Sequence, residues 1–179
     1  MAIIIFDLIL FLAAFFLEGG RKAATNIQEA GKTLSCLGFT KIKNAYSKDT
    51  IFGAAVLLII LLALSLALHT VLGIAGLNDT EKLAQPIEAM KSDIPLLFYM
   101  LTVRVIAEEA FFRGFLARKL GIWLSSLIFA LAHIGYGSIA EVIGAFALGA
   151  MLSAFFLRKK GIYANIYAHS AYNLVALFI

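Results

Sequence analysis

The sequence predicts an all-α, polytopic transmembrane helix bundle of about six spans, with a short amphipathic segment on the cytoplasmic side. The chain has 179 residues, of which 62% are hydrophobic and only 15% charged, whereas soluble domains are nearer half apolar and a quarter charged. It contains fifteen Phe and only two Pro, and several apolar stretches approach the roughly 20 residues that cross a bilayer. We expect one membrane domain, 1–179, made of an N-terminal part, 1–93, and a core, 94–179.

The six expected spans follow the apolar stretches, at 2–17, 51–77, 94–117, 122–138, 139–157 and 161–179. The first lacks the basic start and the cleavage site of a signal peptide, so it is expected to be retained. Asp7 within it is interpreted as a residue near the outer interface. The single Cys36 excludes an internal disulfide.

The distribution of Lys and Arg predicts the orientation. Segment 18–50 and the turns after the third and fifth spans carry eleven basic residues, all on one side of a six-span bundle. The opposite connection, 78–93, has two Lys against four acidic residues. We therefore expect a multi-pass protein of the cell membrane with cytoplasmic basic loops and outer termini. Topology explains the net charge of +4, so lipid is an expected partner and nucleic acid is not.

Segment 18–50 has the spacing of an amphipathic helix on the membrane surface. Its apolar residues recur at three- and four-residue steps, at Ala23, Ala24, Ile27, Ala30, Leu34 and Leu37. Such a helix can anchor the chain to lipid or receive a substrate, or it can simply connect two spans.

Polar side chains within the expected spans mark the candidate site, because charged groups are rare in the bilayer. Counted from the basic ends, Glu108 lies about 15 Å deep, His133 about 18 Å, His169 about 14 Å and Asn173 about 20 Å. Four polar side chains from three helices therefore converge near the middle of a ~30 Å core. His69 lies near the outer end of its span and is expected to be structural.

Helix geometry separates the two adjacent carboxylates. Glu109 and Arg113 are four residues apart and can pair on one face. Glu108 points about 100° away and is free to face the cavity. Arg104, four residues before Glu108, is a competing partner for it, and the spacing alone leaves that competition open.

These residue types suit peptide hydrolysis. Glu108, aided by His133, can deprotonate a water molecule, while His169 and Asn173 can stabilise the developing oxyanion. We expect no cofactor. The alternative is that Glu108, His133 and His169 ligate zinc and leave a fourth position for water, although the single-helix H-E-x-x-H motif is absent.

Three motifs on successive spans resemble the CPBP family, the CAAX protease and bacteriocin-processing (ABI) membrane enzymes, which include the type II CAAX prenyl endopeptidases. In chain order they are Glu108-Glu109-x-x-x-Arg113, Phe129-x-x-x-His133 and His169-x-x-x-Asn173. Each motif is weak alone, but the three in this order are specific. The resemblance covers about 94–179 and does not extend to the first 93 residues.

The resemblance implies a metal-independent intramembrane glutamate protease with a cavity open toward the cytoplasm. It assigns the water-activating base to Glu108 with His133 assisting, and the oxyanion hole to His169 and Asn173. These roles agree with those inferred from helix faces and depth.

The resemblance also implies supporting roles for Glu109 and Arg113, and a packing or lining role for Phe129. The implied substrates are a prenylated CAAX-type protein, which would lose its C-terminal tripeptide, or a small membrane peptide. A non-catalytic peptide-binding or bacteriocin self-immunity protein is the alternative from another class. A proton-coupled transporter would also use buried Glu and His, but it favours two related repeats, which this sequence does not display.

Overall fold

Nearly the whole chain is helical. The computed structural model describes residues 2–178, without the side chains of 2–6, 21–25 and 42. The helices are α1 Ala2–Thr25, α2 Ile27–Cys36, α3 Lys48–Ile74, α4 Ala84–Ser92, α5 Ile94–Tyr99, α6 Val105–Glu108, α7 Arg118–Leu131, α8 Ile139–Lys159 and α9 Tyr163–Ala176. Between them lie two π-helical segments, Met100–Arg104 and Glu109–Ala117, and short 3-10 turns at Ile42–Asn44, Thr80–Leu83 and Ile134–Tyr136. The described residues form no strand, which confirms the all-α fold class.

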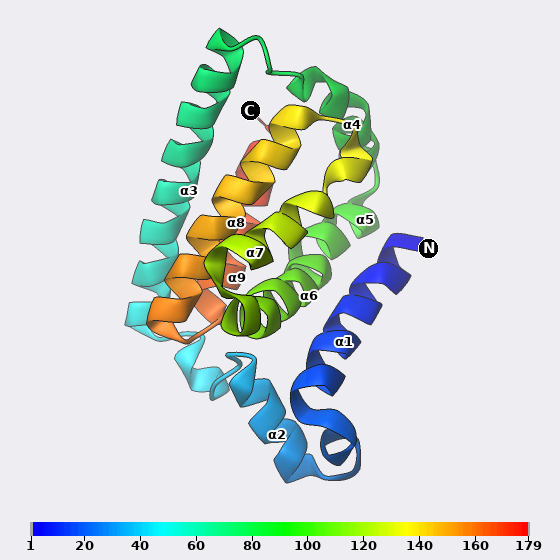
Figure 1. Ribbon diagram of the computed structural model, residues 1–179, viewed down its shortest axis with the longest axis vertical. Coiled ribbons are helices and arrows are strands. Elements are labelled where there is room, and N and C mark those ends of the chain that lie inside the picture. The colour runs from blue at the N-terminus through cyan, green and yellow to red at the C-terminus, as the bar shows by residue number, and fades with distance from the viewer. Residues whose placement is uncertain (1, 179) are drawn as a thin grey trace.

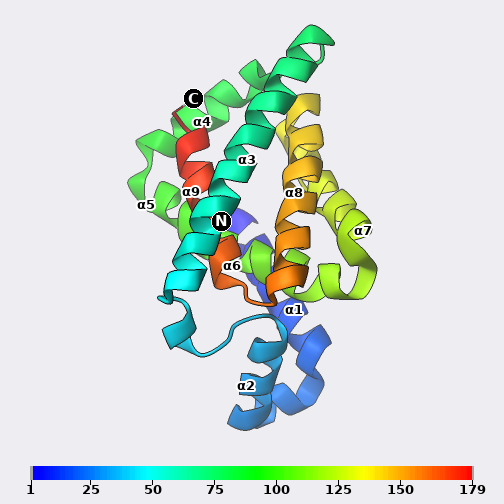
Figure 2. The ribbon, with the colours of Figure 1, turned by 90° about the vertical axis from the view of Figure 1, so that its left-hand side faces the viewer.

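From α3 onward the helices form a bundle in which the chain runs alternately up and down (Figure 1 and Figure 2). Helices α3, α8 and α9 pack together through a core cluster of Leu57, Leu61, Leu152 and Ala168. Helix α7 packs against α8 and the π-helical segment 109–117, while α1 lies beside α6 and that same segment. The bundle thus brings 100–117, α7 and α9, which carry the sequence motifs, into one assembly.

The helix that carries the two glutamates begins at a well-formed cap. Asp93 accepts a hydrogen bond from the backbone N–H of Leu96 at 3.0 Å, and Pro95 occupies the first turn, where its missing N–H has no cost. The helix continues to Ala117 through both π-helical segments. A π turn contains one residue more than an α turn and recurs at functional sites. Here π turns flank the four-residue helix α6, which ends at Glu108.

Gly121 separates two of the expected spans. Its backbone angles (φ 77°, ψ 179°) are not helical, and glycine adopts positive φ without steric cost. The chain turns back at this point, and α7 packs against the 109–117 segment that precedes the turn. Spans 94–117 and 122–138 are therefore distinct packed segments, although helix is nearly continuous from Ile94 to Tyr136.

Three described stretches are long and apolar enough to cross a membrane, at Lys48–Ile74, Ile94–Tyr136 and Ile139–Lys159. The expected spans at 2–17 and 161–179 correspond to α1 and α9, which are not among them. With fourteen residues, α9 is about 21 Å long, short of a ~30 Å core. A membrane-spanning helical protein is supported, and the count of six spans is not.

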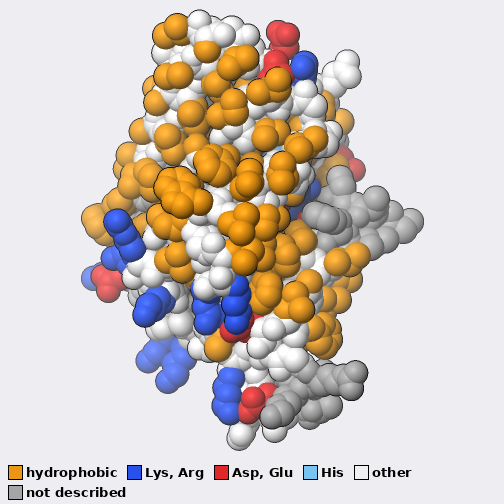
Figure 3. Space-filling model, viewed as in Figure 1, with side chains coloured by type: hydrophobic (Ala, Val, Ile, Leu, Met, Phe, Trp, Pro, Cys, Tyr) orange, Lys and Arg blue, Asp and Glu red, His pale blue; other side chains and the backbone are white. Residues whose placement is uncertain are grey.

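The flanks of the bundle are apolar while its Lys and Arg gather toward one end (Figure 3). On α3, large hydrophobic side chains face outward, including Phe52, Ile59 and Leu66. Such exposure over a whole helix marks a membrane or partner contact in place of solvent. The basic residues belong to the turn at Arg118 and Lys119, the end of α8 at 158–160 and the start of α3.

The segment 18–50 departs from the expected amphipathic helix. Its independent helix is only α2, capped by the Asn26 side chain, and a loop then docks beneath the bundle. In this loop Gly38 O accepts from Ile162 N at 3.2 Å and Thr40 O accepts from Tyr163 OH at 2.8 Å. Docking against the bundle explains why the apolar pattern extends beyond α2.

Asp7, which the sequence led us to expect near the outer interface, is covered by protein. It is buried (1% exposed) and its Oδ2 accepts a hydrogen bond from Tyr99 OH at 2.8 Å. The sequence did not predict this contact, in which α5 supplies the donor.

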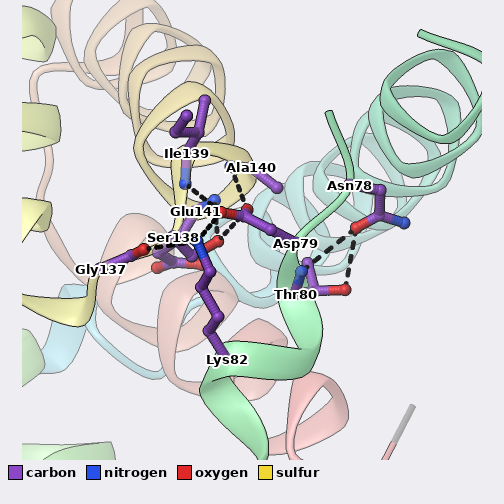
Figure 4. A network of polar contacts seen from close by, with 9 residues as sticks. All are labelled: Asn78, Asp79, Thr80, Lys82, Gly137, Ser138, Ile139, Ala140 and Glu141. Carbon is purple, nitrogen blue, oxygen red and sulfur yellow. Dashed lines mark hydrogen bonds and ion pairs between the residues drawn. The ribbon is translucent and has the colours of Figure 1, made fainter. Parts of the chain in front are cut away.

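At the end of the bundle opposite the α2 loop, Asp79 links the connection after α3 to the turn between α7 and α8 through hydrogen bonds (Figure 4). Its carboxylate accepts hydrogen bonds from Ser138 Oγ and the N–H groups of Ile139 and Ala140 at 2.7–3.1 Å, and it pairs with Lys82 at 2.9 Å. These donors, the Ala140 N–H foremost, hold the pKa of Asp79 well below its usual range. Asp79 and Ser138 thus both accept hydrogen bonds from backbone N–H groups in the first turn of α8.

Candidate active site

Glu109 lies fully buried at the centre of the site. Its Oε1 is 2.8 Å from His169 Nδ1 and 3.3 Å from Arg113 Nη1, and its Oε2 accepts a hydrogen bond from Asn165 Nδ2 at 3.2 Å. The Glu109–Arg113 pair predicted from four-residue spacing is confirmed. Because an ionised carboxylate only accepts hydrogen bonds, Nδ1 of His169 donates. Glu109 therefore joins its own helix to α9.

Glu108 pairs with Arg104. Arg104 Nε donates to Glu108 Oε1 at 2.7 Å, and both side chains are largely buried. The competition that the sequence left open is thus decided in favour of this pair. The second oxygen, Oε2, lies 3.9 Å from His169 Nε2, too far for a direct hydrogen bond and suitable for a small polar group between them.

His169 lies between the two carboxylates. The helix-face argument predicted that Glu108 would face the histidines while Glu109 was occupied by Arg113, but Glu109 makes the shorter contact with His169. Glu108 does face His169, and Glu109 reaches it as well, because the two nitrogens of an imidazole lie on different edges of the ring. With Nδ1 donating to Glu109, Nε2 is an acceptor in the neutral ring and a donor in the imidazolium.

His133, at the end of α7, is oriented by its own helix. Its Nδ1 lies 2.8 Å from Phe129 O, and since a carbonyl only accepts, Nδ1 carries a proton. The His133 ring contacts those of Phe129 and Tyr136, with centroids 4.5 and 5.8 Å apart. His133 also interacts electrostatically with Glu108, so the structure places it near the carboxylate that it was expected to assist.

Phe129 packs at the centre of the site, in agreement with its expected place. Its ring lies 6.3 Å from the His169 ring, and the Arg113 guanidinium is 4.2 Å from its centroid. A buried cation over an aromatic face is stabilised by the ring quadrupole. Arg113 is 0% exposed and no described group accepts a hydrogen bond from its guanidinium, so this stacking and the Glu109 ion pair hold it.

Asn173 lies one helical turn beyond His169 on α9 and is half-buried. No described residue forms a hydrogen bond with its side chain. The structure therefore brings Glu108, Glu109, Arg113, Phe129 and His169 into contact, with His133 beside them, and leaves the Asn173 amide unengaged.

Asn165 was not predicted, although it belongs to the same site. It is 0% exposed, and its Nδ2 donates to Leu152 O at 2.9 Å as well as to Glu109. A signal was present in the sequence: Asn165 precedes His169 by four residues, as His169 precedes Asn173. An Asn in an apolar helix, one turn from a candidate His, lies on the same helix face, so it is itself a candidate site residue.

No group of three His, Cys, Asp or Glu side chains among the described residues is arranged to hold a metal ion. The zinc set considered from the sequence joins Glu108 and His169 at 3.9 Å, while His133 directs Nδ1 at its own helix.

Comparison with known proteins finds one family and one local relative. The family model described as "Type II CAAX prenyl endopeptidase Rce1-like" matches residues 90–175, which include all three motifs. The uncharacterized protein YpbD of Bacillus subtilis (strain 168) is 41% identical over 46 residues, which make up 26% of this chain and 24% of that protein. The match thus spans about a quarter of the relative's length. No solved structure matches.

Proposed function

From the premise that this chain belongs, through residues 90–175, to the Rce1-like family of CAAX proteases, we propose that it is an intramembrane endopeptidase with Glu108 as its water-activating base. The observation that carries the proposal is the Glu108 carboxylate, buried in an apolar bundle with Oε2 directed at His169 across 3.9 Å. Family and composition make the protein a membrane hydrolase; the residue roles, the orientation and the substrate are our proposals.

In the proposed reaction, Glu108 takes a proton from a water molecule that attacks the scissile carbonyl, and His133 assists through its Nε2. The oxyanion that forms is stabilised by His169 and by the unengaged Asn173 amide. Donation from His169 Nε2 requires the imidazolium, because Nδ1 already donates to Glu109. The water provides the hydroxyl for the new carboxylate, and its protons pass through Glu108 to the leaving amine.

We propose that the substrate is a peptide near the membrane that carries an apolar group, such as a prenylated C-terminal CAAX-type segment or a small membrane peptide. A cavity of about 560 Å³ has room for such a group; Ile106, close to Glu108 in sequence, and Tyr163 line it, but none of the candidate catalytic residues does. Its apolar wall includes Phe11, Leu34, Phe39 and Ile106, and Lys41 lines it as well. We propose that the cavity opens toward the cytoplasm, because the basic loops lie at this end of the bundle and cytoplasmic loops carry an excess of Lys and Arg.

The test uses the full chain in lipid nanodiscs with an internally quenched CAAX-type peptide, either farnesylated or unmodified. We expect wild type to cleave the farnesylated peptide, and Glu108→Gln to lower kcat/KM by about a hundredfold or more, as for the loss of a general base. The matched control is Glu88→Gln, an exposed glutamate on α4, with activity within about twofold of wild type.

Each other outcome selects an alternative. Equal cleavage by wild type and Glu108→Gln rejects Glu108 as the base. Loss of activity with a chelator and its return with Zn²⁺ establish the zinc-dependent version. If wild type binds peptides of a broad library but cleaves none, the protein is a peptide-binding or self-immunity protein and the protease proposal fails.

A further inference from the structure

Helix α1 lies outside the family-matched segment, yet it places a carboxylate beside the candidate active site. Asp7 is 1% exposed, its Oδ2 is bonded to Tyr99 OH, and its Oδ1 has no hydrogen-bond partner among the described residues. A buried carboxylate in an apolar bundle is costly unless a nearby cation offsets its charge. Arg104 lies within electrostatic range of Asp7, with no direct ion pair between the two side chains among the described contacts.

Arg104 is placed to serve two carboxylates. Its Nε donates to Glu108, its Nη1 approaches Met100 Sδ at 3.8 Å, and its guanidinium interacts electrostatically with both Glu108 and Asp7. A guanidinium is a planar fork of five donors, so the bond to Glu108 leaves donors unused. The π-helical segment Met100–Arg104 helps this placement, because its wider turns bring residues five apart, such as Tyr99 and Arg104, toward one face.

The Arg104 bond also selects which Glu108 oxygen is available. With Oε1 held at 2.7 Å by Arg104, only Oε2 is directed at His169. If Arg104 were free to rotate around the carboxylate, it could occupy either oxygen. Asp7 attracts the guanidinium from the α1 side, and Tyr99 OH fixes the rotamer of Asp7.

We propose that Arg104 is a positioning residue for Glu108, and that Asp7 and Tyr99 hold Arg104 in place, so that α1 completes the active site. This inference rests on the proposed function. It predicts that Asp7 acts on turnover through Arg104, without contact with the substrate. A purely structural pair would instead lower the amount of folded protein and leave the turnover number of the folded fraction unchanged.

The test is a double-mutant cycle in nanodiscs on the farnesylated peptide, with Asp7→Asn, Arg104→Gln and the double variant. We expect Arg104→Gln to lower kcat about thirtyfold and Asp7→Asn about tenfold, with KM within about twofold in each. In the Arg104→Gln background, Asp7→Asn should lower kcat by less than about twofold, because residues acting through one another are not additive. Arg104→Lys keeps the charge but not the fork, so it should not restore wild-type kcat.

Tyr99→Phe removes only the hydroxyl, and it carries the test if Asp7→Asn does not fold; we expect a loss of about threefold in kcat. Asp49→Asn and Tyr46→Phe, both exposed, are the matched controls and should retain wild-type kcat. The inference is overturned if Asp7→Asn and Tyr99→Phe keep wild-type kcat, or if the Asp7→Asn loss is undiminished beside Arg104→Gln. An inactive wild type would refute the proposed function itself, and the inference with it; an active wild type with an unaffected Asp7→Asn would refute the inference alone.

Discussion

At the scale of single residues, the adjacent carboxylates differ in what they can still do. Glu109 has a partner for each oxygen, from His169, Arg113 and Asn165. Glu108 has one oxygen held by Arg104 and one directed at His169 without a hydrogen bond. A proton acceptor needs an available lone pair, so Glu108 suits the base and Glu109 suits the orientation of the imidazole.

Asn165 provides the first residue-scale prediction. Replacement by Ala leaves Glu109 Oε2 and Leu152 O without their buried donor, at a cost of about 1–3 kcal/mol in the free energy of unfolding. It also frees Glu109 to rotate, so kcat should fall while KM changes little. Reversible unfolding in detergent and steady-state kinetics measure the two effects.

Asn44→Ala is the control for Asn165→Ala. Asn44 is exposed, and among the described residues its side chain donates to Thr40 Oγ1 alone, so its loss should change stability by less than about 0.5 kcal/mol. Equal stability and equal kcat for Asn165→Ala and wild type would remove Asn165 from the site.

At the scale of elements, the loop after α2 determines how closely the N-terminal part meets the core. Leu37 is fully buried, and its backbone carbonyl approaches the helix at Gly114, where a Cβ would lie only 2.5 Å from the oxygen. Gly114 directly follows Arg113 in the first motif. Packing therefore explains the glycine at this position: the backbone of the loop approaches too closely to leave room for a side chain, whatever the catalytic role of the motif.

Gly114→Ala should therefore destabilise the protein although alanine is the better helix former. The clash is with backbone, which cannot rotate away, and overpacking of this kind costs about 1–3 kcal/mol. Gly144→Ala, within α8 where a Cβ meets nothing within 4 Å, should instead stabilise by up to about 1 kcal/mol. Unfolding of the two variants in the same detergent gives the comparison, and a Gly114→Ala variant as stable as Gly144→Ala would show that the loop does not dock there.

At the scale of the whole molecule, periodicity and depth predicted much of the site. Hydropathy identified the helices, and depth brought Glu108 together with His169, because helix rise is regular. What remained hidden depended on contacts between segments far apart in sequence. The covering of Asp7 by α5, the reach of Asn165 to Glu109 and the docking of Leu37 under Gly114 have no local signature. The apolar stretches also did not fix the number of membrane spans, because the length of a stretch does not show how much of it is helical. The expected span at 161–179, for example, contains a helix of only fourteen residues, α9.

The whole-molecule prediction concerns Asp79, which ties the connection after α3 to the start of α8 outside the apolar stretches (Figure 4). The pKa of Asp79 is held below its usual range in the folded protein, so the unfolded chain takes up a proton first as the pH falls. The stabilisation is therefore complete above the usual aspartate pKa of about 4 and is lost as the pH falls below it. Asp79→Asn should lower the unfolding midpoint at pH 7, and its gap to wild type should narrow as the pH falls from about 4 toward about 2.5. The exposed Asp49→Asn variant controls for the removal of an acidic charge, and a constant gap between wild type and Asp79→Asn from pH 7 to about 2.5 would mean that the Asp79 carboxylate does not fasten α8 as an anion.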